Sequence, residues 1–146
     1  MKLAPEAHLR LEKFFREHLK DNELELPPIH VYTGGIARLL TKLLHTGAIT
    51  FGRRILFSPT WIKEEQGRRS LPGWLLAHEV MHVLQYEQEG VLRFFFNYVR
   101  GYWRALRKSG KWDSRARVAA YLAIAEERAA QEVERAYHAW SAKIEA

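Results

Sequence analysis

Apolar residues recur every three to four positions over most of this chain, which is the spacing of helices that bury one face. The pattern predicts four such helices, over residues 5–20, 36–45, 91–108 and 114–142. A fifth helix has Ser70 as its N-cap and Pro72 in its first turn, and it ends before Gly90. Most of the chain is therefore expected to be helical.

Two segments have the β-rich composition of strands instead. Residues 29–32 predict a short strand, and residues 48–58 predict a hairpin whose arms flank Gly52-Arg53-Arg54. All strands thus lie in the N-terminal half, and the C-terminal half is helical. We expect an α+β fold with one small sheet, in a single domain over residues 1–146. Residues 1–90 would hold the sheet and the helix before Gly90, and residues 91–146 the helical part.

The helix that ends before Gly90 carries a His-Glu-x-x-His motif, formed by His78, Glu79 and His82. Histidines four residues apart share one helix face, where their rings can bind one Zn²⁺, and Glu79 can act on a water there. Glu79 is the only charged residue between Gly73 and Gln85. A buried helix with these polar groups needs partners or a metal for them. The alternative is a chance match in which both histidines are hydrogen-bonded core residues.

A catalytic zinc takes three protein ligands and leaves one position for water. A third histidine six residues after the motif is excluded, because Gln85 and Gln88 stand where that pattern needs Gly and His. A glutamate from a later helix is the other solution. Glu126 and Glu127 are the candidates, in an alanine-rich stretch that lets helices approach closely. Helical periodicity does not choose between them.

The segments around these residues resemble the small zincin-like domains found in many bacterial proteins. The stretch from Tyr121 to Gln131 resembles the glutamate helix of gluzincins, the zinc peptidases with a glutamate ligand. This resemblance implies a zincin-like fold, and one Zn²⁺ held by His78, His82 and Glu127. It also implies hydrolysis of peptide bonds by a minimal gluzincin. Gln131 replaces an Asp that supports a histidine ligand in many members, so different groups would surround the ligands here.

The implied mechanism gives roles to further residues. Glu79 would take a proton from the attacking water and pass it to the leaving nitrogen. A nearby donor would share the charge that develops on the carbonyl oxygen. The candidate donors are Tyr121, Tyr137, His138 and Arg128. One arm of the 48–58 hairpin would be an edge strand that pairs with an extended peptide substrate.

The predicted helix over 91–108 is both basic and aromatic. Of the formal net charge of +6, residues 91–117 contribute eight basic side chains against Asp113 alone. Such a segment can bind nucleic acid or an anionic membrane. We favour a packing helix instead, because aromatics at 95, 98 and 102, together with Leu106, follow helical spacing and would form a core against the motif helix, with the arginines outward.

Two other features narrow the function. The chain has no cysteine, which excludes a cysteine-based zinc site and disulfides and fits a reducing compartment. It shows no signal-peptide pattern and no apolar run of the ~20 residues that cross a bilayer, so we expect a cytoplasmic protein. The leading hypothesis is a zinc metallopeptidase. The alternatives are a metal-bound scaffold that acts as a binding module, and a peripheral binder that uses residues 91–117.

Overall fold

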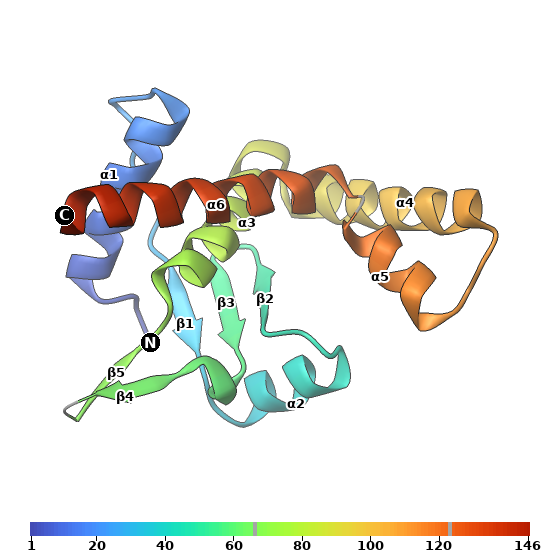
Figure 1. The fold of residues 1–146 in the computed structure, drawn as a ribbon, viewed down its shortest axis with the longest axis horizontal. Coiled ribbons are helices and arrows are strands. Elements are labelled where there is room, and N and C mark those ends of the chain that lie inside the picture. The colour runs from blue at the N-terminus through green and yellow to red at the C-terminus, as the bar shows by residue number, and fades with distance from the viewer. Residues whose placement is uncertain (66, 123) are drawn as a thin grey trace.

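The computed structural model describes residues 1–65, 67–122 and 124–146. The helices are α1 (Pro5–Leu19), α2 (Gly35–Leu43), α3 (Gly73–Glu89), α4 (Val91–Ser109), α5 (Ser114–Leu122) and α6 (Ala125–Glu145), with a short 3-10 helix at Pro59–Trp61. The strands are β1 (His30–Tyr32), β2 (Ala48–Phe51), β3 (Arg54–Phe57), β4 (Lys63–Glu65) and β5 (Arg68–Ser70). The α+β class and the helical C-terminal half are confirmed (Figure 1).

The main sheet has the strand order β1-β3-β2. The central strand, β3, pairs in parallel with β1 and antiparallel with β2, with Thr50 opposite Ile55. Gly52 has a φ of +58° in the turn between β2 and β3, a backbone conformation that glycine adopts at little cost. The predicted hairpin is thus confirmed, and β2 forms one edge of this sheet.

A second hairpin, formed by β4 and β5, was not predicted from the sequence. Ser70 lies in β5 opposite Lys63, so the prediction that Ser70 caps the next helix is wrong. Pro72 occupies the N-cap position and Gly73 begins α3. Local propensity alone favoured the serine cap, whereas pairing with β4 keeps Ser70 extended.

The core lies around α3, which packs between the main sheet and α6 (Figure 1). Ala77, Val80 and Val83 of α3 are fully buried, as are Ile55 and Phe57 of β3. Helix α1 completes this core with its buried Phe14 and Phe15. A helix that is apolar on almost every side is expected to be buried in this way. Its polar residues are therefore held in a rigid, largely dry environment.

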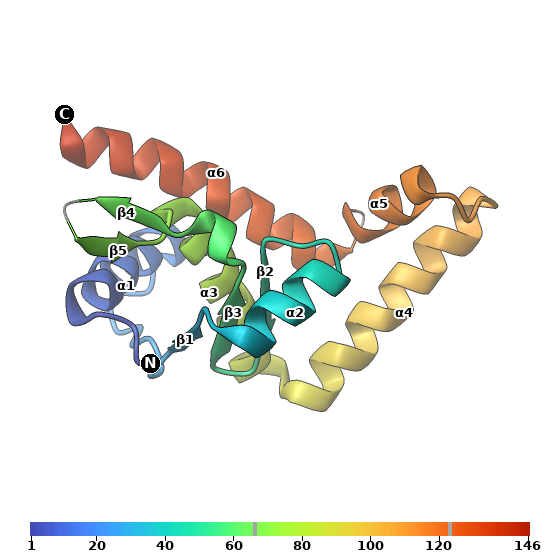
Figure 2. The ribbon, with the colours of Figure 1, turned by 90° about the horizontal axis from the view of Figure 1, so that it is seen from below.

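The single helix predicted over 114–142 is two helices, α5 and α6. That range includes residue 123, which lies outside the described residues. Ile124 has an extended backbone, with φ −63° and ψ 132°, and its side chain is buried. The Asp113 carboxylate accepts a hydrogen bond from the Ala116 N–H at 2.8 Å near the start of α5. The break lets α5 pack back on α4, while α6 runs over α3 (Figures 1 and 2).

Helix α4 does not pack as we expected. Phe94 is buried against α3, with its ring 4.0 Å from that of Tyr86, and Leu106 is buried against α5. Phe95 is exposed, and Tyr98 and Tyr102 are half-buried. The prediction that positions 95, 98, 102 and 106 form a core against α3 is therefore wrong at Phe95 and only partly met at Tyr98 and Tyr102, whereas Leu106 is buried but packs on α5. At the start of α4 the buried residue is Phe94, one position before the predicted Phe95. Several large apolar side chains of α4 are left uncovered by the described part of the chain.

No helix in the described part of the chain combines the length and apolar character needed to cross a bilayer.

Candidate metal centre

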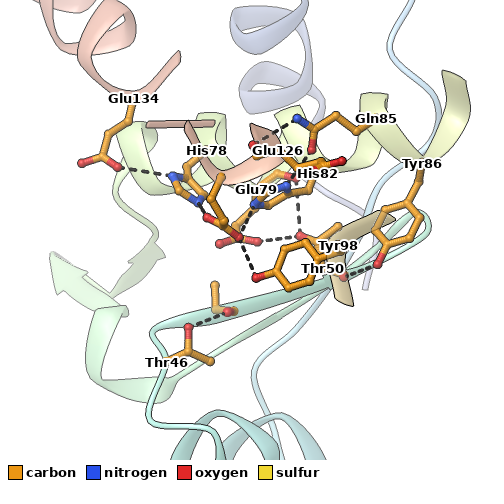
Figure 3. A network of polar contacts seen from close by, with 12 residues as sticks. Thr46, Thr50, His78, Glu79, His82, Gln85, Tyr86, Tyr98, Glu126 and Glu134 are labelled. Carbon is orange, nitrogen blue, oxygen red and sulfur yellow. Dashed lines mark hydrogen bonds and ion pairs between the residues drawn. The ribbon is translucent and has the colours of Figure 1, made fainter. Parts of the chain in front are cut away.

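The two motif histidines lie together on the face of α3 that meets α6. Their ring centroids are 5.2 Å apart. His78 Nε2 lies 3.3 Å from Glu127 Oε2, and His82 Nε2 lies 3.2 Å from Glu127 Oε1 (Figure 3). One carboxylate thus faces the Nε2 atoms of both rings. The spacing of four residues explains how the rings meet, and the approach of α6 explains why Glu127 reaches them.

Glu127 is held in the first turn of α6, next to Glu126. Glu127 is only 2% exposed, whereas Glu126 is half-buried. The unpaired N–H groups at a helix N-terminus favour a carboxylate in this position. The structure brings Glu127, and not Glu126, to the two histidines.

The charges of the cluster depend on one another. Burial opposes ionisation of Glu127, but its contacts with His78 and His82 outweigh burial and hold its pKa below the usual range. Burial alone would lower the pKa of His82, and the Glu127 carboxylate more than reverses this effect, so the pKa of His82 is raised. A cation is therefore favoured at the point where the three side chains meet, and a proton or a metal ion could supply it.

Each histidine also faces a second polar side chain through its Nδ1 atom, on the side of the ring away from Glu127. His82 Nδ1 lies 2.8 Å from Gln85 Oε1, an acceptor, so in the neutral ring Nδ1 carries the proton and Nε2 has the lone pair that a metal needs. Gln85 is itself held by a hydrogen bond from its Nε2 to the carbonyl of Glu126 at 3.1 Å. His78 Nδ1 lies 3.3 Å from Glu134 Oε2, an ion-pair distance without hydrogen-bond geometry. Metal-binding histidines are typically oriented by such partners.

Sequence reasoning missed both of these partners. From the sequence, Gln85 only helps to exclude the three-histidine pattern, and Glu134 belongs to no motif. Glu134 lies seven residues after Glu127, which places both on nearly the same face of one helix. This spacing could have indicated Glu134. Glu134 provides a carboxylate near His78, although Gln131 replaces the Asp that many zincin-like domains have.

Glu79 lies beside the cluster and faces the edge strand β2. The Thr50 hydroxyl donates a hydrogen bond of 2.6 Å to Glu79 Oε2 (Figure 3). Burial raises the pKa of Glu79, partly offset by His82 and by the Thr50 hydrogen bond. A buried carboxylate of raised pKa beside a metal-binding group has the properties of a general base.

A cleft of about 440 Å³ opens onto this cluster. One wall of the cleft is formed by the edge strand β2 and the end of α2. The opposite wall is formed by aromatic residues of α4 and by Tyr121. Glu79, His82 and Glu127 line the cleft as well. Tyr98 extends from α4 and donates a hydrogen bond of 3.1 Å to Glu127 Oε1 (Figure 3). Burial and the Glu127 carboxylate raise the pKa of Tyr98, so its hydroxyl stays protonated. Tyr98 was not among the predicted donors.

The four predicted donors are not brought together. Tyr121 lines the cleft, with its ring 6.4 Å from that of Tyr98. Tyr137 accepts a hydrogen bond from Arg10 at 3.1 Å, and both line a different cavity, with His138. The His138 ring stacks on Trp74, and Arg128 is exposed. Only Tyr121 therefore shares a cavity with Glu79.

The cluster fits a metal ion. His78, His82 and Glu127 each offer a ligand atom, and these atoms all lie within 4.8 Å of one another. Glu127 Oε2 is buried and has no hydrogen-bond partner in the part of the chain that the structure describes. An unsatisfied buried oxygen is costly, and a cation would remove that cost. Two imidazole nitrogens and one carboxylate oxygen form a ligand set that zinc uses in catalytic sites.

Comparison with known proteins identifies a family for the N-terminal part of this site. The family model of the eCIS core domain matches residues 4–90, which is more than half of the chain. The matched range holds His78, Glu79 and His82, but it ends before α4 and therefore excludes Tyr98 and Glu127. No curated protein and no solved structure matches the chain significantly. The family shown is not one of the gluzincins, and this chain belongs to the eCIS core domain family.

Proposed function

We propose that this protein is a zinc-dependent peptidase of the gluzincin type, with His78, His82 and Glu127 as the metal ligands. One observation carries the proposal: the Nε2 atoms of both histidines converge on the buried Glu127 carboxylate, while each Nδ1 faces another polar side chain. A zincin-like arrangement of sheet, motif helix and glutamate helix is part of the same proposal.

Zn²⁺ in this site would supply a water of lowered pKa and a positive charge beside a substrate carbonyl. Glu79 would take a proton from the attacking water and deliver it to the leaving nitrogen. Thr50 holds Glu79 in place through the 2.6 Å hydrogen bond to its carboxylate. Because Thr50 lies on β2, this contact ties the position of the base to the strand beside the cleft.

Tyr98 is the strongest candidate for the donor that stabilises the carbonyl oxygen. Its hydroxyl reaches a metal-ligand oxygen and lines the cleft, and its raised pKa keeps it a donor at neutral pH. Tyr121 is next to it in the same cleft. Tyr137, His138 and Arg128 are not part of the proposed mechanism.

The cleft favours a peptide with a large apolar side chain. Ile49, Phe94 and Phe95 are among its lining residues, and much of its wall is apolar. An extended substrate would lie along β2, which is an edge strand. Two carbonyls of β2 already accept hydrogen bonds from side chains, that of Ala48 from Thr46 and that of Thr50 from Tyr86. Each carbonyl has a second lone pair with which a peptide N–H can bond.

The test is zinc content and peptide hydrolysis, measured on the same preparations of the wild type and three variants. Glu79→Gln should keep zinc and lose hydrolysis, because it removes only the base. Glu127→Ala should lose most of the zinc, whereas the matched variant Glu126→Ala should retain it. Full zinc retention in Glu127→Ala would contradict the ligand assignment. If the zinc-loaded wild type cleaves no peptide in a mixed-sequence library, the protein is a metal-bound scaffold instead.

A further inference from the structure

Helix α4 exposes a stripe of large apolar side chains, of which the proposed peptidase function uses only Phe95, in the wall of the cleft. The structure leaves Leu92 87% exposed and Phe96 64% exposed. The full stripe follows helical spacing and consists of Leu92, Phe95, Phe96, Val99 and Trp103. The residues of α4 that hold it to the body are different ones, Phe94 against α3 and Leu106 against α5. Trp103 also contacts Trp112, with ring centroids 5.5 Å apart, but the stripe as a whole stays exposed to a partner outside the described part of the chain.

A band of cations runs beside this stripe. Arg93, Arg100, Arg104 and Arg107 are three to seven residues apart, so they share the face of α4 opposite its buried side, and all are exposed. None forms an ion pair with any residue that the structure describes, and α4 contains no acidic residue. Asp113, the one acid in residues 91–117, is engaged by the N–H of Ala116. The positive charge is thus not neutralised from within.

We propose that α4 binds an anionic lipid surface, lying in its plane with Leu92, Phe96 and Trp103 among the acyl chains and the arginines at the headgroups. Helices with aromatic and aliphatic residues on one face and Arg or Lys on the other bind membranes in this way. The charge is complementary to that of anionic lipids. A second copy of this chain would bring like charges together, and the aliphatic Leu92 and Val99 have no stacking role on nucleic-acid bases.

The position of the stripe links this surface to the cleft. Phe95 belongs to the stripe and also lines the cleft above Glu79 and His82. Helices α4 and α5 project from one end of the molecule, away from α1 (Figure 2). Binding through α4 would therefore place the cleft beside the lipid surface. The proposal does not depend on metal binding or hydrolysis.

The test is co-sedimentation of the protein with vesicles of phosphatidylcholine, with and without phosphatidylserine. We expect binding to the anionic vesicles that weakens as salt is raised. Leu92→Ser with Phe96→Ser should weaken it at least about tenfold. Arg100→Gln with Arg107→Gln should weaken it about 30-fold, from the usual contribution of a cation near an anionic surface. All substituted side chains are exposed, and circular dichroism checks that each variant is folded.

Matched controls remove the same groups from the far end of the molecule. Leu9→Ser with Ile144→Ser removes two exposed apolar side chains, and Lys13→Gln with Lys20→Gln removes two exposed charges. These variants should bind like the wild type. The proposal fails if the wild type ignores anionic vesicles at low salt. It also fails if the Leu92 and Phe96 changes have no effect while a single-stranded oligonucleotide binds more tightly than vesicles, since the partner is then nucleic acid.

Discussion

Gln85 accepts a hydrogen bond from Nδ1 of His82 at 2.8 Å, three residues away on the same helix. This contact orients the imidazole so that its other nitrogen faces Glu127. Gln85 also donates to the carbonyl of Glu126 in α6, so one side chain connects both helices of the candidate centre. Gln85, which stands where the three-histidine pattern needs a glycine, thus positions one of the two motif histidines.

Replacing Gln85 with Leu should weaken zinc binding by about 10- to 100-fold, because His82 loses its orienting partner. Competition with a chromogenic chelator measures the affinity. Gln88→Leu is the matched control, since Gln88 is exposed one turn nearer the end of α3. Equal affinities of the two variants would show that Gln85 does not support the ligand.

Glu134→Ala should weaken zinc binding about tenfold, because its carboxylate faces Nδ1 of His78 at 3.3 Å. The same chelator competition applies. Glu132→Ala removes an exposed charge from the same helix and should leave the affinity unchanged. A loss of equal size in both variants would indicate a general effect of charge rather than support of His78.

Thr50→Val should lower kcat and leave the zinc content unchanged, because Thr50 positions Glu79 and contacts no metal ligand. The Thr50 hydrogen bond lowers the pKa of Glu79, so its loss raises that pKa further. Glu79 must be ionised to accept a proton. The acidic limb of the pH–rate profile should therefore move to higher pH. Thr50→Ser keeps the hydroxyl and should restore the wild-type profile; an unchanged limb in Thr50→Val would argue against Glu79 as the base.

Tyr98→Phe should lower kcat of the zinc-saturated protein by about 100-fold, if its hydroxyl shares the charge on the carbonyl oxygen. It should also weaken zinc binding about tenfold, because the hydroxyl donates to the proposed ligand Glu127. Tyr102→Phe changes a neighbouring hydroxyl in the same cleft and should have little effect. A larger loss in Tyr121→Phe than in Tyr98→Phe would transfer the donor role to Tyr121.

Gly73→Ala should destabilise the protein by about 1–3 kcal/mol, as is usual when a packed site is overfilled. A Cβ at Gly73 would lie 2.6 Å from the Tyr137 hydroxyl and 2.8 Å from its ring, and that ring packs against Phe14 in the core. Gly101→Ala is the contrasting variant, since its Cβ would meet Ile124 at 3.9 Å. It should stabilise α4 by up to about 1 kcal/mol through helix propensity. Chemical denaturation measures both changes, and similar effects of the two would contradict the packing argument.

The sequence by itself determined the parts of this site that depend on local geometry. A spacing of four residues places His78 and His82 on one face of any helix, and the apolar residues around them require that helix to be buried. The β2–β3 hairpin could be predicted for the same reason, because its turn and its arms are adjacent in the chain.

Only the tertiary structure decided which distant groups meet the histidines. The choice of Glu127 and the contacts of Glu134 and Tyr98 depend on how α6 and α4 pack on α3. The break before α6 sets that packing, and no helical pattern indicated it. Packing also decided that the apolar stripe of α4 is left uncovered by the described part of the chain. Such contacts depend on the three-dimensional path of the chain between distant residues, which local spacing does not specify.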